Sequence, residues 1–245
     1  MYLENISFDA LEPQYLGRFW QTMLGAETLT DAFDLFECRL AMDPGPTLDL
    51  CFCRVPEPPT APRRLHLDLL GGAIADQDAV VARAVAQGAR PTDIGQGTVP
   101  WVVLDDLEGN PFCVMEYRPE YQHTGPIAGI PIDSADPAGD ADFWAWLTGW
   151  EVRPDEQIPR LRHRSGFGPW LELCPEPAPK PEGVEPDAKN QMHLDIRLEA
   201  GDDADQVAAG IVERGGSELE VDWGELPWRV FADPSGNEFC VLPSS

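Results

Sequence analysis

The chain has 245 residues, 43% of them hydrophobic, and a formal net charge of −26 from 17 basic and 43 acidic side chains. This charge excludes a protein built to bind nucleic acid or an anionic membrane; it would favour a cationic ligand, but a solubilising acidic surface is the simpler explanation. No signal peptide or membrane-spanning stretch is apparent, and the six cysteines lack a C-x-x-C motif. We therefore expect a cytoplasmic protein with reduced thiols.

In chain order, a short strand at 6–10 precedes a helix that starts at Pro13 and ends at Gly25, because proline suits a first helical position and glycine a helix end. Apolar spacing predicts a second helix that ends at Gly88. Further strands are expected at about 33–42, 47–54, 64–70, 101–105 and 112–117.

The second half of the chain repeats this order. His66-Leu67-Asp68 returns as His193-Leu194-Asp195, and Gly109-Asn110 returns as Gly236-Asn237, both 127 residues later. Repetition over this length indicates two homologous globular halves rather than a stacked array. We predict a first domain over 1–118, a linker over 119–128 and a second domain over 129–245, in which the Pro-rich stretch 175–189 is an internal loop. Within each half, β-α-β-β followed by β-α-β-β-β, with one strand missed, suggests a deeper duplication.

Repeated residues carry a resemblance to a known family. They are Phe8-Asp9-Ala10 with Pro13 and Phe19-Trp20, Leu65 to Leu69, Gln96-Gly97, Pro100 to Leu104 and Gly109 to Val114, together with their second copies. The chain resembles the vicinal oxygen chelate superfamily, which includes glyoxalase I, bleomycin-resistance proteins, fosfomycin-resistance enzymes and extradiol dioxygenases, and within it the glyoxalase-like branch.

The resemblance implies an α+β fold. Four βαβββ modules would form two tandem domains, each an open β-cup with flanking helices around a ligand cavity. Because single-domain relatives commonly dimerise, the tandem could satisfy that pairing within one chain, and we expect a monomer or homodimer.

The resemblance also implies where a divalent metal would be held. The family's histidine matches His66 and His193, but its first-strand ligand positions match Asn5 and Gly129, and its glutamate positions hold Cys113 and Cys240. Histidine and cysteine could bind Zn²⁺, yet two ligands are too few for a tight site, and buried apolar packing is the simpler role for both cysteines. We therefore expect no cofactor, with Zn, Ni, Mn or Fe as the alternative at His66 and His193.

The strand pattern proposes the catalytic candidates. His66 shares a strand face with Asp68, and His193 shares one with Asp195. Each pair could act as a general base in which the aspartate orients the imidazole. A structural role, in which the histidine bonds a neighbouring strand, is slightly favoured because the pattern occurs in both halves.

Two further groups are candidate ligand-binding residues. Trp101 and Trp228 follow a proline at a strand start and could form an aromatic wall, although core packing is equally consistent. Arg160, Arg162 and Arg164 alternate along one predicted strand and could clamp an anion, although an exposed strand with acidic neighbours would look the same. Their presence in one copy only suggests that the halves have diverged.

The sequence thus predicts a small-molecule-binding protein of this superfamily. The first hypothesis is an enzyme, a lyase or isomerase acting on an oxygenated metabolite with an atypical or absent metal site. The alternative is a non-catalytic protein that sequesters a cationic or aromatic molecule, as in drug or toxin resistance. A structural or regulatory partner protein has no positive sign in the sequence.

Overall fold

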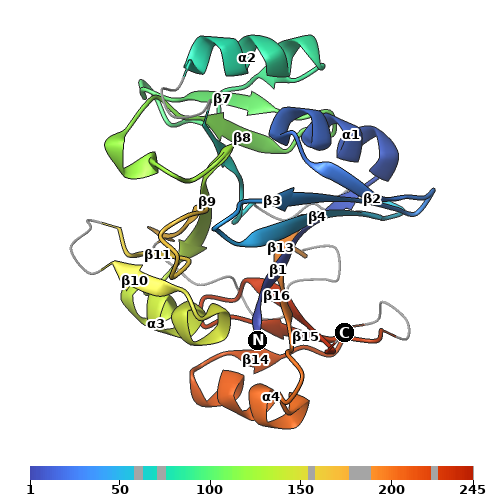
Figure 1. Cartoon of the computed structure of the whole chain (residues 1–245), viewed down its shortest axis with the longest axis vertical. Coiled ribbons are helices and arrows are strands. Elements are labelled where there is room, and N and C mark those ends of the chain that lie inside the picture. The colour runs from blue at the N-terminus through green and yellow to red at the C-terminus, as the bar shows by residue number, and fades with distance from the viewer. Residues whose placement is uncertain (58–62, 71–75, 154–157, 177–188, 222–225, 245) are drawn as a thin grey trace.

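A computed structural model describes residues 1–57, 63–70, 76–153, 158–176, 189–221 and 226–244 (Figure 1). Within these residues the chain forms two open, eight-stranded sheets, which we call sheet A and sheet B. Residues 177–188 of the predicted Pro-rich loop lie outside the described residues. Every described helix is too short or too polar to cross a membrane.

The strands follow four consecutive modules of four, and the two sheets combine these modules across the repeat. Sheet A joins the first module to the fourth, and sheet B joins the second to the third. In sheet A the order is β14 (Ser217–Glu218), β15 (Arg229–Ala232), β16 (Glu238–Leu242), β13 (Met192–Arg197), β1 (Tyr2–Ala10), β4 (Thr47–Arg54), β3 (Leu35–Ala41) and β2 (Glu27–Asp31). In sheet B it is β10 (Glu151–Arg153), β11 (Arg160–Arg162), β12 (Trp170–Pro175), β9 (Ile127–Ser134), β5 (Asp68–Leu69), β8 (Pro111–Val114), β7 (Val102–Asp105) and β6 (Arg90–Pro91).

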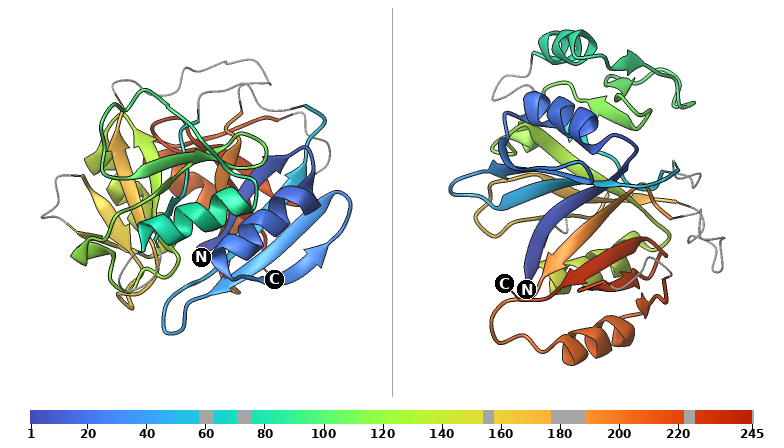
Figure 2. Two further views of the ribbon diagram at one scale, coloured as in Figure 1. Left: turned by 90° about the horizontal axis from the view of Figure 1, so that it is seen from above. Right: turned by 90° about the vertical axis from the view of Figure 1, so that its right-hand side faces the viewer.

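The expected α+β fold of four modules is confirmed, and each sheet takes one module from each repeat. The helices are α1 (Pro13–Leu24), α2 (Gln77–Ala86), α3 (Pro137–Thr148) and α4 (Ala204–Glu213), with a short 3-10 turn, η1 (Pro119–Tyr121), between the repeats. In Figure 2 the α2 and α4 ends of the molecule lie far apart, and both chain termini lie close together.

The helix ends follow the predicted chemistry. Gly25 and Gly149 end α1 and α3 with φ of 68° and 70°, a backbone conformation that side chains disfavour. Asp136 caps α3 through its side chain. The start of α1 has no such cap, and the Glu108 carboxylate instead accepts the backbone N–H groups of residues 11 and 12, each at 2.8 Å.

Some predicted strands differ from those observed. The strand expected at 64–70 shrinks to β5, whose ladder with β9 is interrupted by a register shift between Asp68 and Leu69. Leu65 makes only an isolated bridge to Ile132, so His66 precedes the strand rather than lying within it. The strand that the sequence left unassigned in the first module of each repeat is β2 or its counterpart β10.

A repeated tryptophan ties the two sheets together. In the first repeat, the Trp20 ring of α1 packs against Phe8 of sheet A and Phe112 of sheet B. The ring centroids are 5.6 and 5.1 Å away, in tilted and edge-to-face arrangements. Its indole N–H donates at 3.0 Å to the buried carboxylate of Asp106, in the turn between β7 and β8. Asn110, at the end of that turn, donates to the same carboxylate.

The second repeat builds the same connection in the opposite direction. Trp144 of α3, packed on sheet B, donates at 3.2 Å to Asp233 in the turn between β15 and β16 of sheet A. Its ring lies 5.3 Å from that of Phe239. Burial raises the pKa of Asp233 to about 7, although Asn237 and the indole N–H stabilise its charged form. The repeated Phe-Trp and Asp-x-x-Gly-Asn segments therefore connect the two sheets. We call each hydrogen bond from the tryptophan to the aspartate, Trp20 to Asp106 and Trp144 to Asp233, a brace.

Replacing Trp20 or Trp144 by Phe removes the indole donor and leaves a buried carboxylate short of one partner. We expect each variant to lose about 1–3 kcal/mol of unfolding free energy, measured by urea denaturation. The matched control is Trp228→Phe, because Trp228 is 37% exposed and a surface change costs about 0.5 kcal/mol or less. Equal losses in all three variants would contradict the brace.

Candidate functional site

Strand alternation gives each sheet one apolar and one polar face. Ile6 and Phe8 of β1 belong to the main core under the helices, whereas Asn5 and Ser7 point to the other face. In sheet A, Ser7 pairs with His193 and Asn5 with Asp195 across the β1–β13 ladder. The polar face of each sheet therefore carries one of the predicted histidine–aspartate pairs.

In the structure, a cysteine lies beside each histidine–aspartate pair. His66, Asp68 and Cys113 place their ligand-type atoms within 4.8 Å of one another, and so do His193, Asp195 and Cys240. Cys113 lies beside Asp68 because β5 and β8 run parallel in that register, and Cys240 lies beside Asp195 in the same way. The structure thus unites residues that the sequence suggested separately for catalysis, metal binding and ligand binding. We call these groups centre A (His193, Asp195, Cys240) and centre B (His66, Asp68, Cys113).

The two centres differ in the support given to the aspartate. In centre A, Oδ2 of Asp195 accepts hydrogen bonds from Asn5 Nδ2 at 3.0 Å and Ser7 Oγ at 2.8 Å. These bonds join the first strand of one repeat to the second repeat. The matching positions on β9 are Gly129 and Pro131, whose side chains offer no donor.

Glu172 enters centre B where the glycine leaves space. A Cβ atom on Gly129 would lie 3.1 Å from Glu172 Oε2, so the missing side chain lets this carboxylate approach. Burial and then the charge of Asp68 raise the pKa of Glu172 to about 7, while Arg160 acts against the shift. Arg160 Nη1 lies 3.7 Å from Glu172 Oε1.

Of the two centres, only centre B has aromatic side chains clustered beside it among the described residues. Trp170 and Tyr121 are buried with Cys113 in one apolar cluster, and the half-buried Trp101 packs against it. Trp101 donates its indole N–H to Gln96 at 2.8 Å, and Trp170 donates to the Glu120 carbonyl at 2.9 Å. Beside centre A the corresponding cluster is aliphatic, with Leu219, Val221 and Leu226 packed against Val230, Cys240 and Leu242. Trp228 is exposed and stands outside that cluster.

The predicted arginine stripe is shorter than expected. Arg160 and Arg162 lie on β11, both buried, with their guanidinium groups 4.2 and 4.6 Å from the Trp170 ring. Arg162 also donates to the carbonyls of Gly168 and Gln122, so its charge fixes a turn and the segment after η1. The prediction that Arg164 continues the strand was wrong, because β11 ends at Arg162 and Arg164 is exposed in the following turn.

Electrostatics favour a charged histidine in both centres. Burial opposes protonation of His193, but the neighbouring Cys240 and Asp195 outweigh it and raise its pKa to about 10. His66 shows the same balance, and Asp68 raises its pKa. The side chain of His66 is 30% exposed and that of His193 is 11% exposed. Centre B is therefore the more accessible of the two.

The donor atoms of both centres fit a divalent metal of the zinc type. Imidazole nitrogen, carboxylate oxygen and thiolate sulfur are all zinc ligands. In each centre the buried Oδ1 of the aspartate, in Asp68 and in Asp195, faces the imidazole Nε2 at 3.3 Å as an ion pair, without a well-aligned hydrogen bond among the described residues. A buried acceptor of this kind is costly unless a donor or a cation satisfies it.

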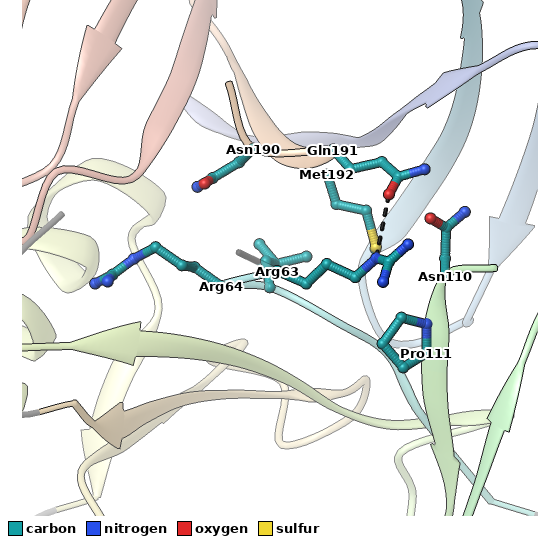
Figure 3. A pocket seen from close by; sticks show the side chains of 8 residues that line it. Arg63, Arg64, Asn110, Pro111, Asn190, Gln191 and Met192 are labelled. Carbon is teal, nitrogen blue, oxygen red and sulfur yellow. Dashed lines mark hydrogen bonds between the residues drawn. The ribbon is translucent and has the colours of Figure 1, made fainter. Parts of the chain in front are cut away.

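A small pocket is lined by no member of either centre (Figure 3). It forms where the segments before β5 and β13 meet, and Arg63 Nε donates there to Gln191 Oε1 at 3.2 Å. Because it holds no member of either centre, we do not treat it as the candidate site. Its lining residues are Arg63, Arg64, Leu65, Asn110, Pro111, Asn190, Gln191 and Met192.

Several site residues escaped the sequence reasoning. Trp170 and Glu172 alternate with buried leucines on β12, and this parity was the available signal that both share a face. Asn5 was noted only as a missing ligand, yet it supports Asp195. Tyr121 lies within the predicted linker, where no pattern marked it.

Glu172→Gln tests the electrostatics of centre B. A carboxyl whose pKa is raised from 4.5 to about 7 on folding retains its proton longer in the folded state, so its contribution to stability falls as pH rises through this window. The Glu172→Gln variant has no titrating group at this position and therefore lacks this pH-dependent contribution to stability. Its unfolding free energy relative to wild type should rise between pH 4.5 and 7, by up to about 3 kcal/mol, in urea titrations. Parallel pH curves for the two proteins would contradict the raised pKa.

Comparisons with known proteins agree with this architecture. A family model described as "Glyoxalase-like domain" matches residues 5–115 and again 129–242. A search among curated proteins found no significant match.

Solved structures share the fold across the whole chain. Glyoxalase I from Zea mays superposes with a TM-score of 0.63 at 14% identity, covering 99% of this chain and 92% of that one. A putative dioxygenase from Bacillus subtilis gives a TM-score of 0.59 at 15% identity, covering 100% and 85%. At this identity the likeness concerns the fold alone. The family match over most of its length shows that the chain belongs to the glyoxalase-like domain family and that it carries two such domains, and the shared fold agrees with the vicinal oxygen chelate superfamily.

Proposed function

We propose that this protein binds a small organic molecule on the polar face of sheet B, beside centre B. The carrying observation is the asymmetry between the two faces: only sheet B, within the described residues, combines an accessible histidine–aspartate pair with clustered aromatic side chains. Binding sites for small molecules commonly pair apolar, aromatic walls with a few polar groups. Trp101 would contact a flat part of the ligand, and His66 and Asp68 would contact its polar group.

The charged residues near centre B are largely paired, which limits what they can offer a ligand. Arg118 Nε lies 2.6 Å from Glu116 Oε1, and Arg160 lies beside Glu172. Arg162 is committed to backbone carbonyls. The partly exposed imidazole of His66 therefore supplies the main polar contact, which suits an oxygenated molecule with an aromatic or otherwise planar body.

Trp101 and Trp228, which occupy matching positions in the two repeats, provide the test. A panel of small aromatic alcohols, amines and α-hydroxy ketones would be screened by the shift in melting temperature and by quenching of tryptophan fluorescence. For any compound that binds, Trp101→Ala and His66→Ala should weaken the affinity about tenfold or more, which corresponds to roughly 1.4 kcal/mol. Trp228→Ala, at the matching position of the second repeat, should leave the affinity unchanged. Equal weakening by both tryptophan variants would contradict the assignment to sheet B.

A second candidate is a lyase or isomerase acting on an oxygenated metabolite, and the donor set of centre B favours it. A divalent ion bound by such a set would polarise a substrate oxygen. With no ion bound, the neutral form of His66, whose Nε2 lies 3.3 Å from Asp68 Oδ1, would itself take up a substrate proton.

Proton exchange distinguishes an enzyme from a binder. If His66 removes a proton next to a carbonyl, α-hydroxy ketones incubated with the protein in D₂O should gain deuterium at that carbon, as followed by NMR. His66→Ala should reduce the rate by at least about 100-fold, and His193→Ala should leave it close to wild type. A bound ketone that shows no exchange above the buffer rate would support the binder instead.

A further inference from the structure

We propose that the pocket between the segments before β5 and β13 is a second ligand site, which takes a small carboxylate with a hydroxyl or amino group next to the acid group. Arg63 would bind the carboxylate, and Asn110 would accept a hydrogen bond from the neighbouring group. The pocket is lined by no member of centre A or centre B. This inference therefore goes beyond the function proposed above and does not depend on it.

The two Gly-Asn turns hold their asparagine side chains in the same orientation. Asn110 Nδ2 donates at 2.9 Å to Asp106 Oδ2, and Asn237 Nδ2 donates at 2.9 Å to Asp233 Oδ2. Because the donor end of each amide is held by a carboxylate, its acceptor, Oδ1, is left for a partner outside the turn.

The two repeats differ in whether this acceptor is satisfied. Asn237 Oδ1 accepts a hydrogen bond from Arg64 Nε at 2.8 Å. The position that matches Arg64 in the second repeat, 127 residues later, holds Gln191. Asn110 is 2% exposed, and its Oδ1 has no hydrogen-bond partner among the described residues. A buried acceptor without a donor is costly, so a ligand that donates a hydrogen bond here would be favoured.

Arg63 supplies a positive charge at the same pocket. Its Nε donates at 3.2 Å to Gln191 Oε1, and among the described residues this is the one hydrogen bond of its guanidinium group. Figure 3 shows this group beside the Gln191 and Asn110 side chains. Arg63 is an exposed residue, so its two Nη atoms can bind a carboxylate, whose two oxygens match the guanidinium fork.

The neighbouring arginine has a different role. Arg64 is buried, and its guanidinium group donates to Asn237 Oδ1 and to the carbonyls of Asp133 and Ser235. It therefore joins the two repeats structurally, and Arg63 is the arginine that is left for a ligand.

The pocket also limits the size and charge of the ligand. Its apolar walls come from Leu65, Pro111 and Met192, of which Leu65 and Met192 are buried. The space is small, so the hydroxyl or amino group enters while the carboxylate stays at the exposed guanidinium group. A shift of the Arg63 side chain, held by one hydrogen bond, admits the donor group to Asn110 Oδ1. The net charge of −26 opposes polyanions, which favours a ligand with a single acid group.

A ligand in this pocket would bridge the two repeats. Arg63 and Asn110 belong to the first repeat, and Gln191 and Met192 belong to the second. Because unfolding separates these residues, a ligand that binds them together raises the melting temperature in proportion to its occupancy of the folded state.

A comparison of lactate with propionate, which lacks the hydroxyl group, tests the contact with Asn110. In calorimetric titrations of the full chain, lactate should bind about tenfold or more tightly than propionate, because only lactate can satisfy the buried oxygen. Lactate should also raise the melting temperature. Equal affinity for the two acids, or no binding of lactate at millimolar concentrations, would overturn the proposal.

Arginine variants test the contact with the carboxylate. Arg63→Gln should weaken lactate binding about tenfold or more, because it removes a charge-assisted hydrogen-bonding pair. Arg164→Gln is the matched control, because Arg164 is also exposed and does not line the pocket. Lactate affinity that is unchanged in Arg63→Gln, or lowered equally in both variants, would contradict the assignment.

Gln191→Arg restores the residue type of the first repeat. Its guanidinium group should donate to Asn110 Oδ1, as Arg64 does to Asn237. The variant should then have a raised melting temperature without ligand and should lose lactate binding, whereas retained binding would count against the pocket. If it fails to fold by circular dichroism, the Arg63→Gln result decides the question.

Trp101→Ala separates this site from the proposed function. Lactate affinity should be unchanged in this variant, because Trp101 lies beside centre B and does not line the pocket. Loss of lactate binding in Trp101→Ala would place lactate at centre B and overturn the proposal. The aromatic ligands of centre B are not used in any of these titrations, so the two proposals can fail separately.

Discussion

The rest of the structure depends on one hydrogen bond made twice, from a buried indole to a buried carboxylate. Trp20 of α1, which packs on sheet A, donates to Asp106 in a turn of sheet B. Trp144 of α3, which packs on sheet B, donates to Asp233 in a turn of sheet A. Each repeat therefore spans both sheets. Because an unpaired carboxylate in this position is costly, the brace holds each helix against a turn of the opposite sheet.

Crossing repeats make each centre a joint product of both halves. In centre A, β1 of the first repeat supplies Asn5 and Ser7, and the second repeat supplies His193, Asp195 and Cys240. In centre B the roles are reversed, and β9 and β12 of the second repeat face His66 and Asp68. Divergence of a single strand thus changes the centre that contains the other repeat's histidine. Gly129 and Pro131 stand where the first repeat has Asn5 and Ser7. The Glu172 carboxylate lies in the space beside Gly129.

Much of the fold followed from the printed residues. Apolar spacing and the terminal Pro and Gly residues predicted α1 and α3, and the repeat predicted four modules. The sequence analysis named the cysteines at the family's glutamate positions and the histidine–aspartate pairs as separate candidates. Parallel pairing of β5 with β8, and of β13 with β16, brings each aspartate beside a thiol. Pairing between strands far apart in sequence leaves no periodic signal within either strand.

The sequence by itself determined which residues recur, which face of each strand is apolar, and where the helices begin and end, because these depend on neighbours within a few positions. Only the tertiary structure decided that modules combine across the repeats, that Trp170 and Tyr121 stand beside one histidine while Trp228 is left exposed, and that β11 ends before Arg164. These outcomes depend on contacts between residues 50 to 190 positions apart, whose energies the local pattern does not contain.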